Sequence, residues 1–181
     1  MALTEIIGAR ITDVIAIRPA QVDDAAALAA AYVRNRRFLA PWEPVRDEYF
    51  FTAAGQRDRI EAALADLTGH SCLITEDGGI IGMISLSGIT RGPAQSANLG
   101  YWVAESANGR GVATQAVRLM FDVAFGELNL HRLQAGTLLH NLGSQRVLER
   151  NGFERIGVAR SYLNIAGSWQ DLILFQRVTD R

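Results

Sequence analysis

The chain has 181 residues, a formal net charge of -1 and a hydrophobic share of 49%. This length and composition indicate a single domain, residues 1–181, with a sizeable core. The nearly neutral charge provides no general positive field, so we expect no direct binding of nucleic acid. All 18 basic residues are arginines. The absence of lysine excludes a P-loop and a pyridoxal Schiff base.

Cys72, the single cysteine, limits the chemistry further. One cysteine excludes an internal disulfide and a cysteine-based metal cluster, and its apolar neighbours favour a buried structural side chain. We expect no metal site. The sequence has no apolar run of the ~20 residues that span a membrane, and its start lacks the features of a signal peptide. These observations favour a cytoplasmic protein without membrane contact.

The N-terminal part of the chain predicts a strand followed by a helix. Residues 1–10 are weakly patterned and can form an N-terminal extension, whereas β-branched residues predict a strand over 11–18. Either Asp23 or Asp24 can cap the helix that follows. The expected inner face of this helix consists of Leu28, Ala31 and Tyr32.

A loop and a second helix come next. Residues 34–44 combine clustered arginines, aromatic side chains and two prolines, a composition that favours a loop. Apolar residues at helical spacing then predict a helix over about residues 52–67. Its expected inner face consists of Ile60, Leu64 and Leu67.

The middle of the chain is dominated by strand signals. A turn at 76–79 predicts a hairpin that joins strands over 70–75 and 80–89, and another strand is expected over 97–104. A glycine-bearing turn then leads into a long amphipathic helix. The expected apolar stripe of this helix consists of Ala113, Ala116, Val117, Met120, Phe121 and Ala124.

The C-terminal part completes an α+β pattern. A strand is expected over 132–139, and a short helix begins at Asn141 and ends before Gly152, which is a suitable left-handed cap. Two further strands are expected over 158–163 and 172–178. The order of elements predicts a hairpin-rich sheet with one central strand–turn–helix crossover.

The turn before the long amphipathic helix carries the clearest chemical signal. Its small residues Gly109, Gly111 and Ala113 let the backbone approach a ligand closely. The first helical turn adds unpaired N–H groups and positive dipole potential, which suit a pyrophosphate. Arg110 can add a charge to the same phosphates. A plain strand–helix turn is the structural alternative.

This turn resembles the acyl-CoA signature of the GCN5-related N-acetyltransferase (GNAT) family, (Gln/Arg)-x-x-Gly-x-(Gly/Ala). The chain reads Asn108-Gly109-Arg110-Gly111-Val112-Ala113 and departs from the pattern only at Asn108. The segment from Asn141 to Phe153 is similar to a second family motif. The resemblance implies an α/β/α GNAT fold, a mixed and largely antiparallel sheet of about seven strands flanked by about four helices. Its fourth and fifth strands are expected to splay apart.

Further segments resemble the RimJ/RimL branch, and in particular RimJ-type ribosomal-protein-alanine N-acetyltransferases. These segments are Phe38 to Glu48, Arg91-Gly92, Leu99-Gly100-Tyr101, Tyr162-Leu163 and Gly167 to Asp171. The similarity covers about residues 11–178 and implies a ribosomal-protein or peptide N-terminus as the acceptor. Dimers are common among such relatives, so a homodimer stays open.

The family resemblance also implies how the donor is held. Acetyl-CoA is the expected cosubstrate, and the acetyl group passes directly to a primary amine in a ternary complex without a metal. Backbone groups near Tyr101, Trp102 and Val103 are expected to hold the pantetheine arm, which Asn141 also contacts. The pyrophosphate is expected on the segment formed by Asn108, Gly109, Arg110, Gly111, Val112, Ala113 and Thr114.

Acetyl transfer also needs a proton donor for the leaving sulfur and a base for the amine. Leu148 stands where many relatives carry a tyrosine acid, and the branch implies Ser144 in its place. The structural alternative for Ser144 is a polar residue in the first turn of a helix. Glu43 is the candidate base, with Asp171, Glu105 or a water chain as alternatives.

Three functions remain open at this stage. The branch resemblance favours acetylation of the N-terminal alanine of a ribosomal protein. The first alternative is an acetyltransferase for a small amine, such as an antibiotic, a polyamine or an amino acid, and the second is a CoA-binding module without turnover. Trp42 and Trp169 either line the acceptor groove or pack as buried aromatic residues.

Overall fold

The computed structural model of the chain describes residues 15–179. The expected extension over residues 1–10 and the first part of the strand expected over 11–18 therefore lie outside the described residues. The strands are β1 (Ile15–Pro19), β2 (His70–Glu76), β3 (Gly79–Thr90), β4 (Ser96–Val103), β5 (Arg132–Leu138), β6 (Glu154–Ile165) and β7 (Ser168–Val178). The α-helices are α1 (Ala25–Leu39), α2 (Ala53–Ala65), α3 (Val112–Phe121) and α4 (Leu142–Arg150).

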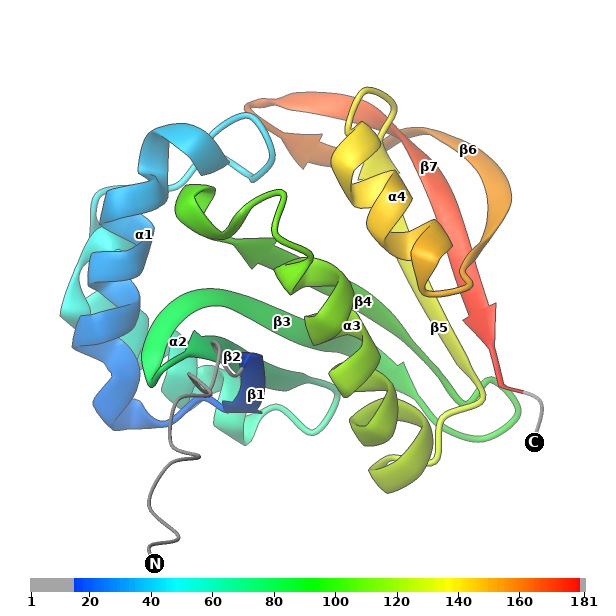
Figure 1. The fold of residues 1–181 in the computed structure, drawn as a ribbon, viewed down its shortest axis with the longest axis horizontal. Coiled ribbons are helices and arrows are strands. Elements are labelled where there is room, and N and C mark those ends of the chain that lie inside the picture. Colours follow the sequence, from blue (N-terminus) through cyan, green and yellow to red (C-terminus); the bar gives the residue numbers. More distant parts are fainter. Residues whose placement is uncertain (1–14, 180–181) are drawn as a thin grey trace, which may run out of the picture.

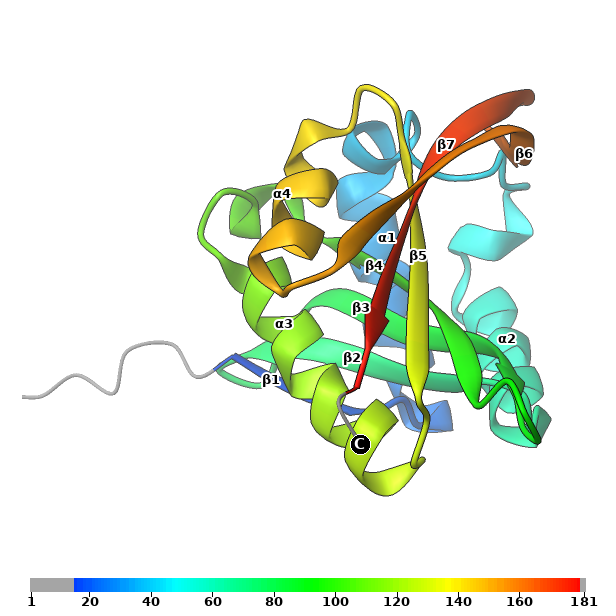
Figure 2. The same cartoon turned by 90° about the vertical axis from the view of Figure 1, so that its right-hand side faces the viewer.

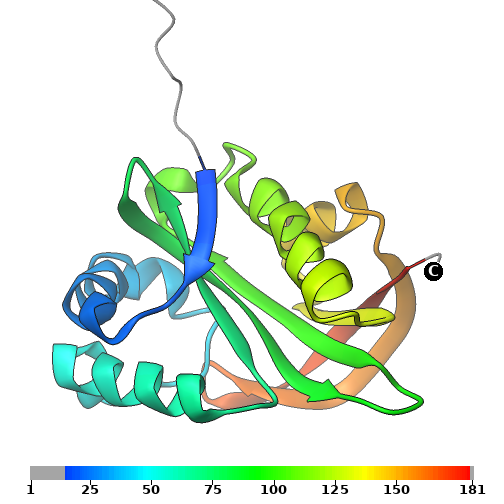
Figure 3. The same cartoon turned by 90° about the horizontal axis from the view of Figure 1, so that it is seen from below.

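All seven strands belong to one mixed sheet in the order β1-β2-β3-β4-β5-β7-β6. Helices α1 and α2 cover one face of the sheet, and α3 and α4 cover the other (Figures 1 and 3). This architecture confirms the predicted α+β fold of about seven strands and four helices. No helix within residues 15–179 is long and apolar enough to cross a membrane.

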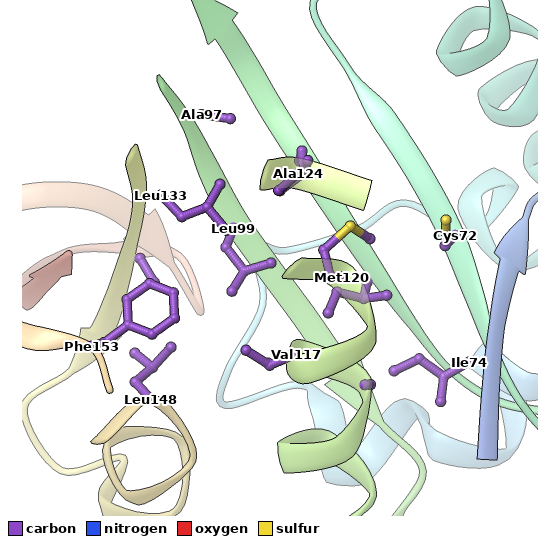
Figure 4. Packing of buried hydrophobic residues seen from close by; sticks show 14 of the residues in the cluster. Cys72, Ile74, Ala97, Leu99, Val117, Met120, Ala124, Leu133, Leu148 and Phe153 are labelled. Atoms are coloured by element: carbon purple, nitrogen blue, oxygen red, sulfur yellow. The ribbon is translucent and has the colours of Figure 1, made fainter. Parts of the chain in front are cut away.

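Each face of the sheet has its own hydrophobic core, because successive side chains of a strand point to opposite faces. On β2, Cys72 and Ile74 belong to the core beneath α3, whereas Leu73 belongs to the core beneath α1. Figure 4 shows the first core, in which Val117 and Met120 of α3 pack over the sheet. Burial raises the pKa of Cys72 to about 11, in agreement with a structural thiol.

The first helix is longer than expected. Leu28, Ala31 and Tyr32 are buried as predicted, but α1 continues to Leu39, so residues 34–39 are helical and not part of a loop. The arginines in this stretch are good helix formers. The chain leaves the helix only shortly before Pro41, which cannot continue it.

The inner face predicted for the second helix is only partly correct. Ile60 is buried, but Leu64 and Leu67 are 60% and 94% exposed. Gln56 is fully buried instead, and its side-chain amide donates to the backbone carbonyl of Phe50. A pattern of apolar residues does not reveal a buried glutamine. The hydrogen-bond partner that allows its burial lies outside the helix, in the turn before it.

The parallel pairing between β4 and β5 is confined to residues 96–98 and 132–134. Beyond these residues, β4 stays paired with β3 as far as Val103, and β5 stays paired with β7 as far as Leu138. The two strands therefore diverge while each keeps its outer neighbour (Figure 1). The predicted splay of the fourth and fifth strands is confirmed.

The close approach of β3 and β4 at the divergence generates a stability prediction. A Cβ on Gly82 would lie 2.4 Å from the carbonyl oxygen of Trp102. We therefore expect Gly82→Ala to lower the free energy of unfolding by about 1–3 kcal/mol, as measured by urea denaturation. Gly126→Ala is the matched control, because its new Cβ meets open space. Equal stability of the two variants would contradict the close approach.

Candidate active site

The loop from Asn108 to Gly111 forms a backbone cradle between the end of β4 and the start of α3. Gly109 and Gly111 have φ angles of 76° and 82°, and a Cβ on either residue would meet open space. Such positive φ angles strain other residues, which explains the two glycines. The first-turn N–H groups and the dipole of α3 add positive potential here. The cradle therefore suits an anion such as a pyrophosphate.

Two polar side chains brace this cradle. The Asn108 side-chain oxygen accepts the backbone N–H of Gly109 at 3.0 Å, so the residue that departs from the family pattern stabilises the loop. Arg110 donates to both carboxylate oxygens of Glu76, at 3.1 and 2.6 Å. These bonds hold the arginine beside β2.

The remaining cradle residues contribute through their backbone. The side chain of Val112 is buried in the core, so only its main chain can face a ligand. Ala113 and Thr114 complete the first turn of α3, and their N–H groups belong to the set that a helix leaves without a partner of its own. The structure thus brings the predicted pyrophosphate residues together at one helix end.

The diverging end of β4 carries Tyr101, Trp102 and Val103. Tyr101 and Val103 pack on the core beneath α3, whereas Trp102 packs on the core beneath α1. The strand therefore presents neighbouring side chains to opposite faces, at the position where it no longer pairs with β5. A ligand lying between β4 and β5 would have Tyr101 on one side and Trp102 on the other.

On the α4 face, a cap and a hydroxyl pair lie beside the divergence. The Asn141 side-chain oxygen caps α4 by accepting the backbone N–H of Ser144 at 3.0 Å. The hydroxyl oxygens of Ser144 and Tyr101 are 2.9 Å apart. Burial raises the pKa of Tyr101 to about 12, although the hydrogen bond with Ser144 acts in the opposite direction. The phenol therefore keeps its proton near neutral pH.

On the α1 face, an aromatic pair connects β4 to the candidate base. The indole N–H of Trp102 donates to the Tyr32 hydroxyl at 2.8 Å. Burial raises the pKa of the Glu43 carboxyl, and the charges of Arg46 and Arg59 partly offset this effect. The charge of Glu43 in turn contributes to the raised pKa of Tyr32, after burial. Glu43 therefore lies within electrostatic reach of the aromatic pair.

The segment that carries Glu43 is fixed by distant parts of the chain. Its carbonyl accepts the backbone N–H of Ala166 at 2.9 Å, and Figure 2 shows the turn between β6 and β7 beside this segment. Trp42 packs against the small core at the end of β5, with its ring centroid 5.4 Å from that of His140. Trp169, by contrast, is 66% exposed.

The other candidate carboxylates lie in different environments. Asp171 accepts the backbone N–H of Ser161 at 2.8 Å, and Ser161 has a φ of 48° at a register shift of β6. Glu105 is exposed and lines a hollow of about 440 Å³ with Arg34. Within residues 15–179, no group of three or more His, Cys, Asp and Glu side chains could hold a metal ion.

A cleft of about 400 Å³ lies beside the Glu43 segment, and we call it the α2 cleft. The guanidinium groups of Arg46 and Arg59 lie 4.6 and 4.4 Å from the ring centroid of Phe50. The cleft is lined by Val45, Arg46, Asp47, Tyr49, Phe50, Gly55, Asp58, Arg59 and Ala62. The sequence analysis did not assign these two arginines to a site, because Arg46 comes from the loop before Phe50 and Arg59 comes from α2.

A backbone cradle beside two diverging strands, with a hydroxyl pair on one face and a carboxylate of raised pKa on the other, is an arrangement typical of a GNAT acetyltransferase. The model of the family described as "Acetyltransferase (GNAT) domain" matches residues 15–154, so the chain belongs to this family. The predicted family and enzyme class are thereby confirmed.

Relatives named as N-acetyltransferases match most of the chain. The Bacillus subtilis protein named "Probable N-acetyltransferase YjcK" is 41% identical and covers 86% of this chain and 88% of its own length. The Escherichia coli uS5-alanine N-acetyltransferase is 33% identical, and the match covers 90% of this chain and 87% of that protein. The solved RimJ of Mycobacterium smegmatis, in complex with CoA-disulfide, is 30% identical with a TM-score of 0.88, and the match covers 92% of this chain and 82% of that one.

The open glycine positions of the cradle generate a binding prediction. Gly111→Ala should weaken the binding of CoA about tenfold, a loss of about 1.4 kcal/mol, because the new Cβ occupies the ligand side and strains the backbone. Isothermal titration calorimetry measures this change. Gly92→Ala is the control, since Gly92 also has a positive φ and open space at its Cβ but lies before β4, at the other end of that strand. Equal losses in the two variants would show backbone strain alone.

Proposed function

We propose that this protein acetylates the N-terminal α-amine of a ribosomal protein that begins with alanine. Acetyl-CoA is the donor, the reaction proceeds in a ternary complex, and the reaction takes place in the cytoplasm. The observation that carries the proposal is Glu43, a carboxylate of raised pKa whose charge acts on Tyr32 in the core beneath α1, on the other side of the sheet from Ser144. Identity to proteins named as uS5-alanine N-acetyltransferases supports the acceptor class.

The donor has a path from the cradle to the divergence of β4 and β5. The segment from Asn108 to Thr114 would hold the pyrophosphate through backbone N–H groups and the α3 dipole. The pantetheine arm would then follow the edge of β4 at Tyr101, Trp102 and Val103, which β5 no longer occupies. Asn141, at the start of α4, lies at the end of this path.

The two faces of β4 would carry out separate steps. Glu43 would take a proton from the ammonium group, so that the neutral amine attacks the thioester carbonyl carbon. As the N–C bond forms and the C–S bond breaks, the sulfur leaves with the bonding electron pair, and the nitrogen releases its remaining extra proton to solvent to give the amide. A hydrogen bond from the Ser144 hydroxyl would stabilise the resulting thiolate.

The protonation chemistry favours an α-amine over a lysine side chain. An N-terminal amine has an ordinary pKa of about 7.7–8.0, compared with about 10.4 for lysine. Near neutral pH, a carboxylate of raised pKa can therefore deprotonate an α-amine with a smaller energetic cost than a lysine side chain. Glu43 fits this requirement because burial raises its pKa while Arg46 and Arg59 limit the rise.

A small amine is the second candidate acceptor. The α2 cleft has a volume of about 400 Å³, which falls within the range of small-molecule sites. In addition, the name of the 41% identical YjcK specifies N-acetyltransfer without an acceptor. A small-molecule acceptor would use the same cradle and the same Glu43, so the two candidates differ only in what occupies the acceptor side.

An acceptor panel distinguishes these candidates. Assays that detect free CoA thiol would compare an alanine-starting ribosomal-protein peptide, its N-blocked form, polyamines and aminoglycosides. We expect a kcat/KM for the free peptide about 100-fold or more above that for any small amine, with acetyl located on the α-amine by mass spectrometry. Faster turnover of a small amine would refute the ribosomal assignment, and no turnover of any amine would favour the CoA-binding module.

Glu43→Gln should have opposite effects on activity and stability. Loss of the base should lower kcat about 100-fold. The pKa of Glu43 is raised in the folded state. Above a pH of about 4.3, the pKa of a glutamate in the unfolded chain, ionisation of Glu43 therefore destabilises the fold. This cost disappears as the pH falls below that pKa. The variant should therefore melt at a higher temperature than the wild type at pH 7, and the difference should disappear near pH 4.

Glu48→Gln is the matched control in the same segment. Arg36 lowers the pKa of this exposed carboxylate. Ionisation of Glu48 therefore stabilises the fold, the opposite of the effect expected for Glu43. We expect Glu48→Gln to retain kcat and to show no gain in melting temperature at pH 7. Retention of kcat in Glu43→Gln would exclude Glu43 as the base.

A further inference from the structure

The side chains of Tyr101 and Ser144 connect two elements that diverge from each other. Tyr101 lies on β4 and Ser144 lies in the first turn of α4, 43 residues later. Their hydroxyl oxygens are 2.9 Å apart, and the phenol oxygen is also 3.4 Å from the Ser144 carbonyl oxygen. At this position β4 does not pair with β5, so the side-chain contact joins β4 to the helix that follows β5.

The direction of this hydrogen bond decides what Ser144 can do. The Asn141 side chain already accepts the backbone N–H of Ser144 and fixes the start of α4. If the phenol donates to Ser144 Oγ, the serine proton is free to point to another acceptor. If the serine donates to the phenol, that proton is unavailable. The phenol remains protonated near neutral pH and can act as the donor, and Ser144 Oγ at 2.9 Å is a nearer acceptor for its proton than the Ser144 carbonyl oxygen at 3.4 Å.

We infer that Tyr101 is a positioning residue for acetyl transfer, whose hydroxyl donates to Ser144 Oγ and thereby directs the Ser144 proton toward the sulfur of the departing CoA. The inference rests on the proposed role of Ser144. In the transfer step, the C–S bond breaks and the sulfur takes the electron pair. The chain from Tyr101 O–H to Ser144 O–H to sulfur spreads this charge, and no proton has to leave the phenol.

The position of the pair supports this role. Both hydroxyls lie on the α3 and α4 face, where the proposed donor path leads, whereas Trp102 packs on the other face beside Tyr32, on which the charge of Glu43 acts. Hydrogen bonds in series polarise one another in a site of low dielectric constant. A phenol that donates to Ser144 therefore makes the serine a better donor to the sulfur than an isolated hydroxyl.

A double-mutant cycle tests the inference. Ser144→Ala should lower kcat about 100-fold. Tyr101→Phe should lower kcat on the order of tenfold, the size of a coupling within one hydrogen-bond network, while the KM for acetyl-CoA and the Kd for CoA remain within about twofold. Tyr101→Phe should have no further effect in the Ser144→Ala background. In Ser144→Thr, which keeps the hydroxyl, the effect of Tyr101→Phe should return.

A purely structural role for Tyr101 would give a different result. The factors by which Ser144→Ala and Tyr101→Phe each lower kcat would multiply in the double variant. In Tyr101→Phe, the melting temperature and the affinity for CoA would fall together with kcat. That outcome, or a full rate in either single variant, would overturn the inference. Ser87→Ala provides the control for removal of a hydroxyl, because Ser87 is exposed on β3, and its kcat should equal that of the wild type.

The choice of acceptor separates this test from the proposed function. The cycle is measured with the amine that reacts fastest, so preference for a small amine would refute the ribosomal assignment and still test Tyr101. If no amine reacts, enzymatic hydrolysis of acetyl-CoA releases the same thiol and provides the rate. Equal hydrolysis by wild type and Tyr101→Phe would then count against the inference.

Discussion

The organisation of the site depends on the short pairing between β4 and β5. Two parallel strands that share only residues 96–98 and 132–134 leave backbone groups on their facing edges that a ligand can use. Parallel strands also end at the same edge of a sheet, and each of these strands is followed by a helix that begins there. The N-termini of α3 and α4 are thus both placed at the opening between the strands, where an extended anionic cosubstrate would enter.

The alternation of side chains along β4 would divide the proposed chemistry between the two faces of the sheet. Tyr101 faces the hydroxyl of Ser144, and Trp102 faces Tyr32 on the side of Glu43. A thioester held between β4 and β5 would therefore have its leaving sulfur and its attacking amine on opposite sides. This separation would keep Glu43, the proposed base, away from Ser144, which would stabilise the thiolate. It requires only that Tyr101 and Trp102 occupy neighbouring positions on one strand.

The features that the sequence predicts correctly are those that local spacing determines. The turns at Gly109 and Gly111, the cap at Asn141 and most strands depend on residues close together in the chain. The errors at Leu64 and Leu67 arose because helical spacing does not show which face a neighbouring helix will cover. The bond between Trp102 and Tyr32 joins residues 70 positions apart. Contacts over such distances depend on the whole sheet, and a resemblance to a motif does not reveal them.

The raised pKa of Glu43 requires that the segment around it stay in place. A carboxylate on a free loop would move into water and return to its ordinary pKa, because the ionised form is more stable there. The hydrogen bond from the Ala166 N–H to the Glu43 carbonyl opposes this movement. The charges of Arg46 and Arg59 limit the rise in the pKa of Glu43 that burial causes. The turn between β6 and β7 and Arg59 of α2 therefore both influence the pKa of Glu43, the proposed base.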